Sequence, residues 1–191
     1  MDIILGRANS NKIMNRMLFK SNEQYGARVG SISGGGLRNA IPRESFAILA
    51  VSDGDNFEQH INTLGAIIKS EYATTDPDLE VILEKCDTPS KVMNGKEQDA
   101  LIKAIYGCPN GIYRMSSEVK GLVQTSNNVA RVLVENGEYT VMCLSRSAVN
   151  SERDDVAQSI QGTFELIGAA VTFSGVYPGW APKPSSEICN I

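Results

Sequence analysis

The residues best suited to chemistry in this sequence are clustered in one short segment. The stretch GGGLRNAIPRES, residues 34–45, carries Arg38, Asn39 and Arg43 between segments that read as strands. An arginine guanidinium presents a planar fork of donors that matches a carboxylate, and an asparagine amide can donate to or accept from a peptide group. Pro42 restricts the backbone, so the segment is stiffer than its three glycines imply. A stiff turn of this kind can orient side chains toward an anionic ligand.

Arg146 is the second candidate, at the end of the apolar stretch YTVMCLSRS. By two-residue alternation it shares a strand face with Met142 and Leu144, where a guanidinium needs an anion or a solvent edge. Structural interpretations remain open for both candidates. Asparagine is a common turn former, which favours a structural role for Asn39, and a strand-end arginine can simply extend to water.

Other kinds of active site find little support. His60 is the only histidine, so a self-contained histidine-based zinc site or a Ser-His-Asp triad is close to excluded. We expect His60 to lie on the polar face of a helix. The four cysteines, which have no CxxC spacing, are expected to be reduced core residues of a cytoplasmic protein; they are Cys86, Cys108, Cys143 and Cys189.

Bulk properties restrict the partners. The net charge of −4 and the pI near 5.1 lack the basic excess that binds phosphate backbones, so nucleic acid is not expected as a partner. No apolar run approaches the roughly 20 residues needed to cross a bilayer, and the first residues do not read as a signal peptide. We therefore expect a soluble protein without a membrane partner.

Apolar spacing predicts the elements that position the candidates. In the first half it predicts a helix within residues 6–26 that Gly26 can end, a short extended segment at 27–33, a buried strand within 45–53, a helix with Phe57, Ile61, Leu64 and Ile68 on one face, and a strand at 79–85. In the second half it predicts a helix at 95–107, strands around an Asn136-Gly137 turn, a helix opening at Ser151 with Val156, Ile160, Phe164 and Ile167 on one face, and a strand at 169–177.

Both halves thus follow the order helix, strand, strand, helix, strand. A bend with asparagine precedes the longest strand in each, at Asn39 and at Asn127 and Asn128. This order predicts an α+β fold made of a duplicated unit, residues 1–88 and 89–176, with antiparallel sheets and helices packed on one face. Residues 177–191 form a separate, Pro- and Gly-rich segment.

Four blocks of the sequence resemble one known family. They are GGGLRNAIPRESFA, CPNGIYRMSSEVKGLVQTSNNVARV, CLSRSAV and GVYPGWAP. With the opening DIILGRANSNKIMNRML, they closely resemble the lid domain of the bacterial aminoacyl-histidine dipeptidases, carnosinase-like cytosolic enzymes that cleave Xaa-His and other dipeptides. The resemblance covers essentially the whole chain and implies a fragment of a larger cytoplasmic hydrolase.

The resemblance also implies that substrate binding and catalysis belong to different domains. In that family a separate catalytic domain holds two zinc ions and uses a glutamate as general base. Those motifs do not occur in this chain, so the resemblance implies that the fragment alone is inactive and binds no zinc. It further implies that residues 177–191 return toward the missing catalytic domain, and that a homodimer through the lid is possible.

Two site residues follow from the resemblance. Asn39 matches the lid asparagine that is implied to contact the dipeptide near the scissile bond, a possible transition-state contact. Arg146 matches the lid arginine that is implied to grip the C-terminal carboxylate of the substrate. The resemblance assigns no role to Arg38 and Arg43, and Asn128 is left open because the family more often has a Leu-Asn-Val-Gly run at this place. The alternative is a free-standing duplicated α+β module that binds a small ligand or mediates oligomerisation.

Overall fold

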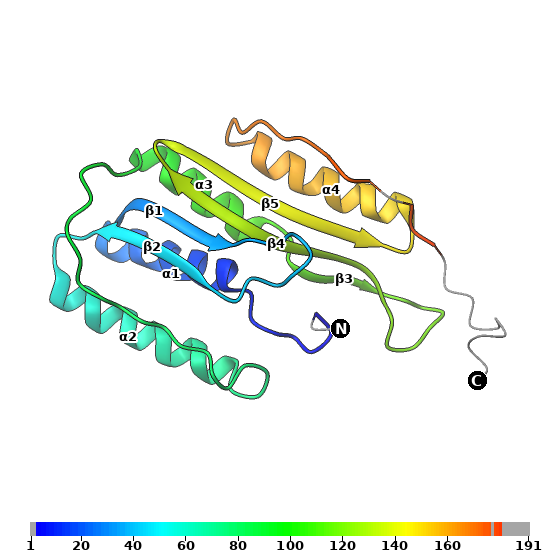
Figure 1. Cartoon of the computed structure of the whole chain (residues 1–191), viewed down its shortest axis with the longest axis horizontal. Coiled ribbons are helices and arrows are strands. Elements are labelled where there is room, and N and C mark those ends of the chain that lie inside the picture. The colour runs from blue at the N-terminus through cyan, green and yellow to red at the C-terminus, as the bar shows by residue number, and fades with distance from the viewer. Residues whose placement is uncertain (1–2, 177, 181–191) are drawn as a thin grey trace.

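The strands of both halves of the chain join in a single antiparallel sheet. The structure is a computed structural model that describes residues 3–176 and 178–180, and its strand order is β2-β1-β4-β3, with β5 pairing along the other edge of β4. The elements in chain order are α1 (Ser10–Tyr25), β1 (Arg28–Gly35), β2 (Ser45–Ala50), α2 (Gly54–Glu71), α3 (Gly95–Gly107), β3 (Gly111–Met115), β4 (Val123–Glu135), β5 (Glu138–Ser147) and α4 (Asn150–Glu165) (Figure 1).

Local signals account for the best-predicted elements. Gly26 ends α1 in the left-handed conformation, with φ of 58°, and its N–H bonds to the carbonyl of Asn22. Asn136 and Gly137, with φ of 54° and 83°, form the two-residue turn between β4 and β5. The predicted helices and this hairpin are confirmed.

Apolar side chains place the helices on one face of the sheet. The main core joins α1, α3 and α4 to the inward residues of the strands, among them Val129 of β4, Leu101 of α3 and Val156 of α4, all buried. Helix α2 packs instead on α1, through a second cluster around Phe57 and Ile68. The α+β class is confirmed, and the described helices leave the other face of the sheet open (Figure 1). None of these helices is long and apolar enough to span a membrane.

The two strands expected to close the halves are not formed. Residues 79–85 and the described part of 169–177 join no ladder. In the first segment Leu79 and Val81 pack against the α2 cluster while Ile82 is 72% exposed. The apolar alternation reflects burial on one side, which does not require a strand partner, so the expected strand is wrong. The division at residues 88 and 89 stays a prediction, and residues 181–191 lie outside the described part of the chain.

Three smaller expectations are also wrong. The run at residues 45–53 forms β2, which is an edge strand, and Phe46 on it is 65% exposed. Helix α4 begins after Val149 with no side-chain cap, so Ser151 is not the N-cap. Asn127 and Asn128 lie inside β4 and not in a bend, because β3 and β5 both extend the pairing of β4 past them.

Candidate functional site

The loop from residue 36 to residue 44 connects β1 to β2 and contains a β-turn. The Ala40 N–H donates to the carbonyl of Leu37 at 3.2 Å, which places Arg38 and Asn39 at the two central positions of that turn. Asn39 is exposed, and no hydrogen bond of its side chain is found within the described residues. The turn-forming role of Asn39 is therefore observed, but it leaves the side-chain amide free to meet a ligand.

Gly34 and Gly35, at the end of β1 just before this loop, allow the backbone to pass close to β4 and α1. Gly35 has φ of 71°, and a Cβ at this position would overlap the carbonyl of Ala130. A Cβ on Gly34 would overlap the side-chain oxygens of Asn11 and Ser45. Only glycine fits both constraints at Gly35, because other residues rarely adopt this φ. Gly34 and Gly35 thus serve close packing, whereas a Cβ on Gly36 would meet nothing within 4 Å.

Contacts from three directions hold the loop. Arg131 of β4 donates to the carbonyl of Gly35 at 2.7 Å, and the Ser10 N–H donates to the carbonyl of Pro42 at 3.1 Å. Arg43 forms an ion pair of 3.2 Å with Asp76. Asp76 is itself mostly buried, since it also accepts hydrogen bonds from Arg7 and from the backbone N–H of Ala8. Arg43 therefore has a structural contact, and Asp76 is a residue that the sequence did not single out.

Arg146 lies on the open face of the sheet. It pairs with Ser126 across the β4 to β5 ladder, and its neighbours on the same face are Leu144, opposite Asn128, and Met142, opposite Arg131. This side of the sheet is turned to solvent and Arg146 is exposed, so water can solvate the guanidinium beside its apolar neighbours. Within the described residues its side chain has no hydrogen-bond or ion-pair partner.

Every other arginine of the chain is engaged, and all of them lie in the described part. The carboxylate partners are Asp76 for Arg7 and Arg43, Glu71 for Arg16, Glu152 for Arg114 and Asp154 for Arg153; the other acceptors are the carbonyls of Met93 for Arg28 and Gly35 for Arg131, and the hydroxyl of Ser174 for Arg38. Arg146 is thus the one guanidinium for which the described residues offer no hydrogen-bond or ion-pair partner.

The fold brings the two candidates to the same region. Asn128, two residues along β4 from the residue that pairs with Arg146, donates its side-chain amide to the carbonyls of Arg38 and Ala40, at 3.3 and 2.7 Å. These carbonyls flank Asn39. The turn carrying Asn39 therefore rests against β4, near the end of β5 that carries Arg146.

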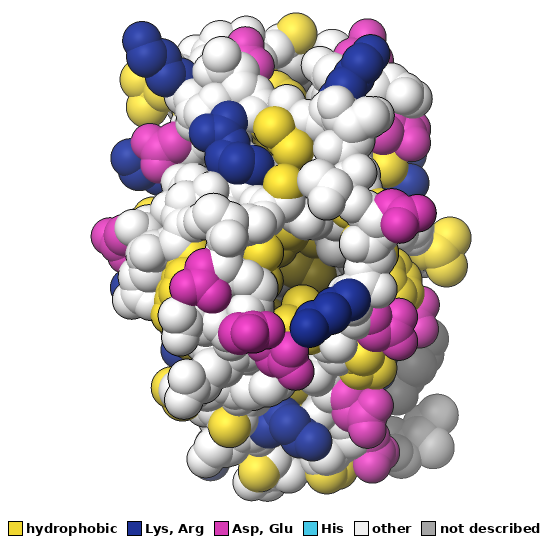
Figure 2. Space-filling view, turned by 90° about the vertical axis from the view of Figure 1, so that its left-hand side faces the viewer, with side chains coloured by type: hydrophobic (Ala, Val, Ile, Leu, Met, Phe, Trp, Pro, Cys, Tyr) yellow, Lys and Arg dark blue, Asp and Glu magenta, His cyan; other side chains and the backbone are white. Residues whose placement is uncertain are grey.

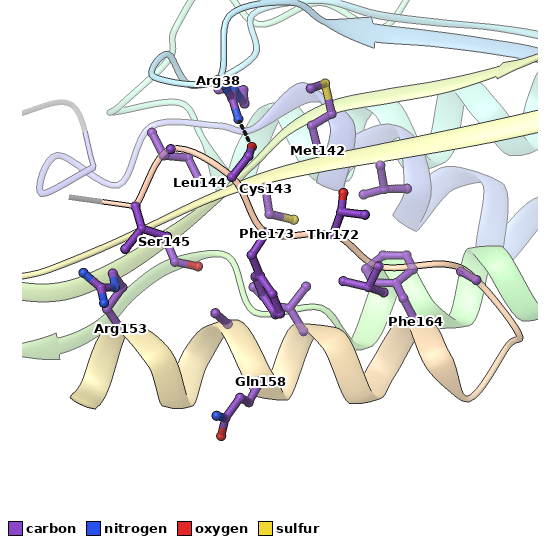
Figure 3. Close-up of a pocket in the computed structure, with 18 of the residues that line it drawn as sticks. Arg38, Met142, Cys143, Leu144, Ser145, Arg153, Gln158, Phe164, Thr172 and Phe173 are labelled. Carbon is purple, nitrogen blue, oxygen red and sulfur yellow. Dashed lines mark hydrogen bonds between the residues drawn. The ribbon is translucent and has the colours of Figure 1, made fainter. Parts of the chain in front are cut away.

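A cavity of about 890 Å³ borders this region. It lies between β5, α4 and the segment of residues 168–176, and both Arg38 and Arg146 line it. Figure 3 shows Arg38, Met142 and Leu144 on one side of β5, and Phe164 and Phe173 on the side of α4. The hydrogen bond from Arg38 to Ser174, 3.1 Å, crosses from the loop to the segment after α4.

Three of the four cysteines lie in the described part of the chain, and all three are free thiols. Cys108 and Cys143 are free thiols with their Sγ atoms 3.8 Å apart, and Cys86 is an exposed free thiol. The hydrogen bond between the two thiols lowers the pKa of Cys143 and raises that of Cys108. Cys108 is buried and Cys143 half-buried, but the expectation that Cys86 is a core residue is wrong, because Cys86 is exposed. Cys189 lies outside the described residues.

His60 lies on α2, as a helix residue, and is half-buried. Its ring lies 4.7 Å from that of Tyr25 and 6.4 Å from that of Phe57, and burial lowers its pKa. Across residues 3–176 and 178–180, no group of three or more His, Cys, Asp or Glu side chains could hold a metal ion. The described residues therefore do not fit a zinc centre. Figure 2 shows acidic and basic side chains interspersed over one end of the molecule, without a basic patch there.

Three comparisons with known proteins all find similarity to peptidases. The profile of the peptidase dimerisation domain matches residues 2–76. The cytosol non-specific dipeptidase of Escherichia coli (strain K12) is 34% identical over 192 residues, which is all of this chain and 40% of that protein. The crystal structure of aminoacylhistidine dipeptidase from Vibrio alginolyticus superposes with a TM-score of 0.91 at 38% identity, covering 97% of this chain and 38% of that one. The chain thus spans about two fifths of the length of each relative.

Proposed function

We propose that this chain is the lid and dimerisation domain of a dipeptidase, which its similarity to the peptidase dimerisation domain and to two dipeptidases supports. In this role it binds the dipeptide substrate of a larger metal-dependent hydrolase. In this proposal Arg146 binds the C-terminal carboxylate of the dipeptide and Asn39 contacts the peptide near the scissile bond. The catalytic metal ions, which we propose to be two zinc ions, belong to a catalytic part outside this chain. The parent enzyme would act in the cytoplasm and pair with a second copy through the lid.

The observation that carries the proposal is that Arg146 has no hydrogen-bond or ion-pair partner among residues 3–176 and 178–180. An arginine without a carboxylate partner, on an exposed sheet face and at the rim of a cavity, supplies a planar donor pair to an incoming carboxylate. This contact is the same in the ground state and in the transition state, so it increases affinity and fixes orientation.

The position of Asn39 supports a different role. Asn39 lies at the centre of a turn whose backbone is hydrogen-bonded to β4, so its side-chain N–H can be aimed at an oxygen that gains negative charge during the reaction. A donor placed in this way contributes mainly to the transition state. Asn39 would then affect kcat, whereas Arg146 would affect KM.

The test uses steady-state kinetics of the complete enzyme that contains this lid. Arg146→Ala is expected to raise KM for dipeptides about 30-fold or more with a small change in kcat, because a charge-assisted bidentate contact contributes roughly 2 to 3 kcal/mol. Asn39→Ala is expected to lower kcat about 100-fold with a small change in KM. Arg16→Ala, which removes only an exposed ion pair with Glu71, serves as control.

Wild-type values of KM and kcat in both Arg146→Ala and Asn39→Ala would contradict the roles proposed for these two residues. Binding of dipeptides by the 191-residue chain alone, measured by titration calorimetry, would favour the free-standing ligand-binding module instead, because the lid role predicts negligible binding without the catalytic part.

A further inference from the structure

We propose that Asn128 is a positioning residue for Asn39: its side-chain amide holds the turn that presents Asn39 to the substrate. This inference rests on the proposed role of Asn39. Asn128 itself lies on β4 and is placed to touch the backbone on both sides of Asn39, not the substrate.

The contacts of Asn128 bracket Asn39. Its Nδ2 donates to the carbonyl of Ala40 at 2.7 Å and to that of Arg38 at 3.3 Å. These carbonyls belong to the residues before and after Asn39. One side chain therefore fixes the turn at the place where an error in backbone position moves the Asn39 amide most.

A second asparagine fixes the orientation of the first. The Nδ2 of Asn9 donates to the Oδ1 of Asn128 at 3.0 Å, and also to the Oδ1 of Asn110 and the carbonyl of Val129. The Oδ1 of Asn9 accepts the N–H of Lys12 as the N-cap of α1. Because Asn9 must point its oxygen at the helix, its amide nitrogen must face Asn128.

The chain of amides therefore has one direction. With Oδ1 of Asn128 occupied by Asn9, the only orientation left for its Nδ2 is toward the loop carbonyls. Asn9 is 5% exposed, so the start of this chain is sheltered from competing water. Two asparagines, Asn9 and Asn128, which lie 119 positions apart, thus link the N-terminus of α1 and β4 to the loop of residues 36–44.

Kinetics of the complete enzyme test the inference through a double-variant cycle. Asn128→Ala is expected to lower kcat about 10-fold, with KM within threefold of wild type, because a displaced catalytic contact reduces the rate more than affinity. Asn128→Asp is expected to lower kcat further, since a carboxylate would face two carbonyl oxygens. The Asn39→Ala/Asn128→Ala double variant is expected to match Asn39→Ala within twofold, because Asn128 acts through Asn39.

Ser126→Ala is the matched control, since Ser126 lies two residues away on β4, opposite Arg146, and its side chain makes no hydrogen bond within the described residues. It is expected to leave kcat unchanged. If Asn128→Ala lowers kcat by the same factor with and without Asn39, the effect is a general loss of structure and the inference fails. Wild-type kcat in Asn128→Ala overturns it as well.

Hydrogen exchange in the 191-residue chain separates this inference from the proposed function. Asn128→Ala should speed exchange of the Ala40 amide, which closes the turn, about 10-fold or more, and leave the β4 to β5 hairpin amides unchanged. If Asn39→Ala has no effect on kcat, the proposed function is wrong whatever the exchange shows. If exchange at Ala40 is unchanged in Asn128→Ala, the positioning inference is wrong even when Asn39 is essential.

Discussion

Two irregular segments of this chain lie at the rim of the same cavity but are held by different forces. Residues 36–44 have no regular structure, yet hydrogen bonds and an ion pair from α1, β4 and Asp76 fix them. Residues 168–176 pack through Ala169 and Val171 against the main core, and Arg38 reaches them from the loop. The comparison teaches that directional polar contacts, more than apolar pattern, determine where a precise contact can be built.

The largest expected effect is at Gly35, the last residue of β1, directly before the first segment. Gly35→Ala is expected to lower the free energy of unfolding by about 2 to 4 kcal/mol, because the residue must hold a positive φ while its new Cβ meets the Ala130 carbonyl. Urea unfolding of the chain measures this. Gly36→Ala, whose Cβ would meet nothing within 4 Å, should lie close to wild type. Equal losses in both would show that flexibility, not close approach, requires the glycines.

Asp76 tests the ion pairs that hold the same loop. Asp76→Ala removes the partner of Arg7 and Arg43 and leaves the Ala8 N–H without its acceptor, so we expect a loss of about 1 to 3 kcal/mol. Asp78→Ala, an exposed neighbour, is the control and should stay within about 0.5 kcal/mol of wild type. Thermal unfolding at matched ionic strength distinguishes the two. Similar stabilities for both variants would contradict the anchoring of the loop by Asp76.

The second segment should respond to apolar truncation only. Val171 is half-buried against the core, so Val171→Ala is expected to reduce stability by about 1 kcal/mol, whereas Phe173→Ala, with Phe173 56% exposed, should reduce it by less than about 0.5 kcal/mol. Urea midpoints check this order. The reverse order would mean that the segment is held by Phe173 over the cavity and not by the core.

The smallest effect concerns His60, outside both segments. Burial lowers its pKa, so the unfolded chain binds more protons as pH falls below the ordinary histidine value, and stability falls with it. We expect the urea midpoint of wild type to decrease more between pH 7 and pH 5 than that of His60→Gln. Identical pH profiles of the two proteins would show that folding does not lower the pKa of His60.

The sequence predicted the elements that local rules control. Gly26 and the Asn136-Gly137 turn demand positive φ, and apolar spacing marks the buried faces of α2 and α3. It failed at residues 79–85 and 169–177 because alternation reports burial on one side and not the presence of a pairing strand. It also read β2 as fully buried, since an edge strand on a sheet with an open face can be as apolar as a central one.

The site was predictable in part. Asn39 and Arg146 came from the resemblance, while residue types alone left structural interpretations open for both. The polar contacts that hold the loop were missed because their members lie far apart: Asn9 and Asn128 are separated by 119 positions, and Arg43 and Asp76 by 33. No local pattern reports such pairs. That Arg146 lacks a partner within the described part of the chain is likewise visible only when the partners of every other arginine are known.

The most direct test of the central claim compares dipeptides with their C-terminal amides in the complete enzyme. If Arg146 binds the substrate carboxylate, amidation should raise KM about 30-fold or more in wild type and only a few-fold in Arg146→Ala, because the variant has already lost the contact. An equal increase of KM on amidation in both proteins would contradict the account.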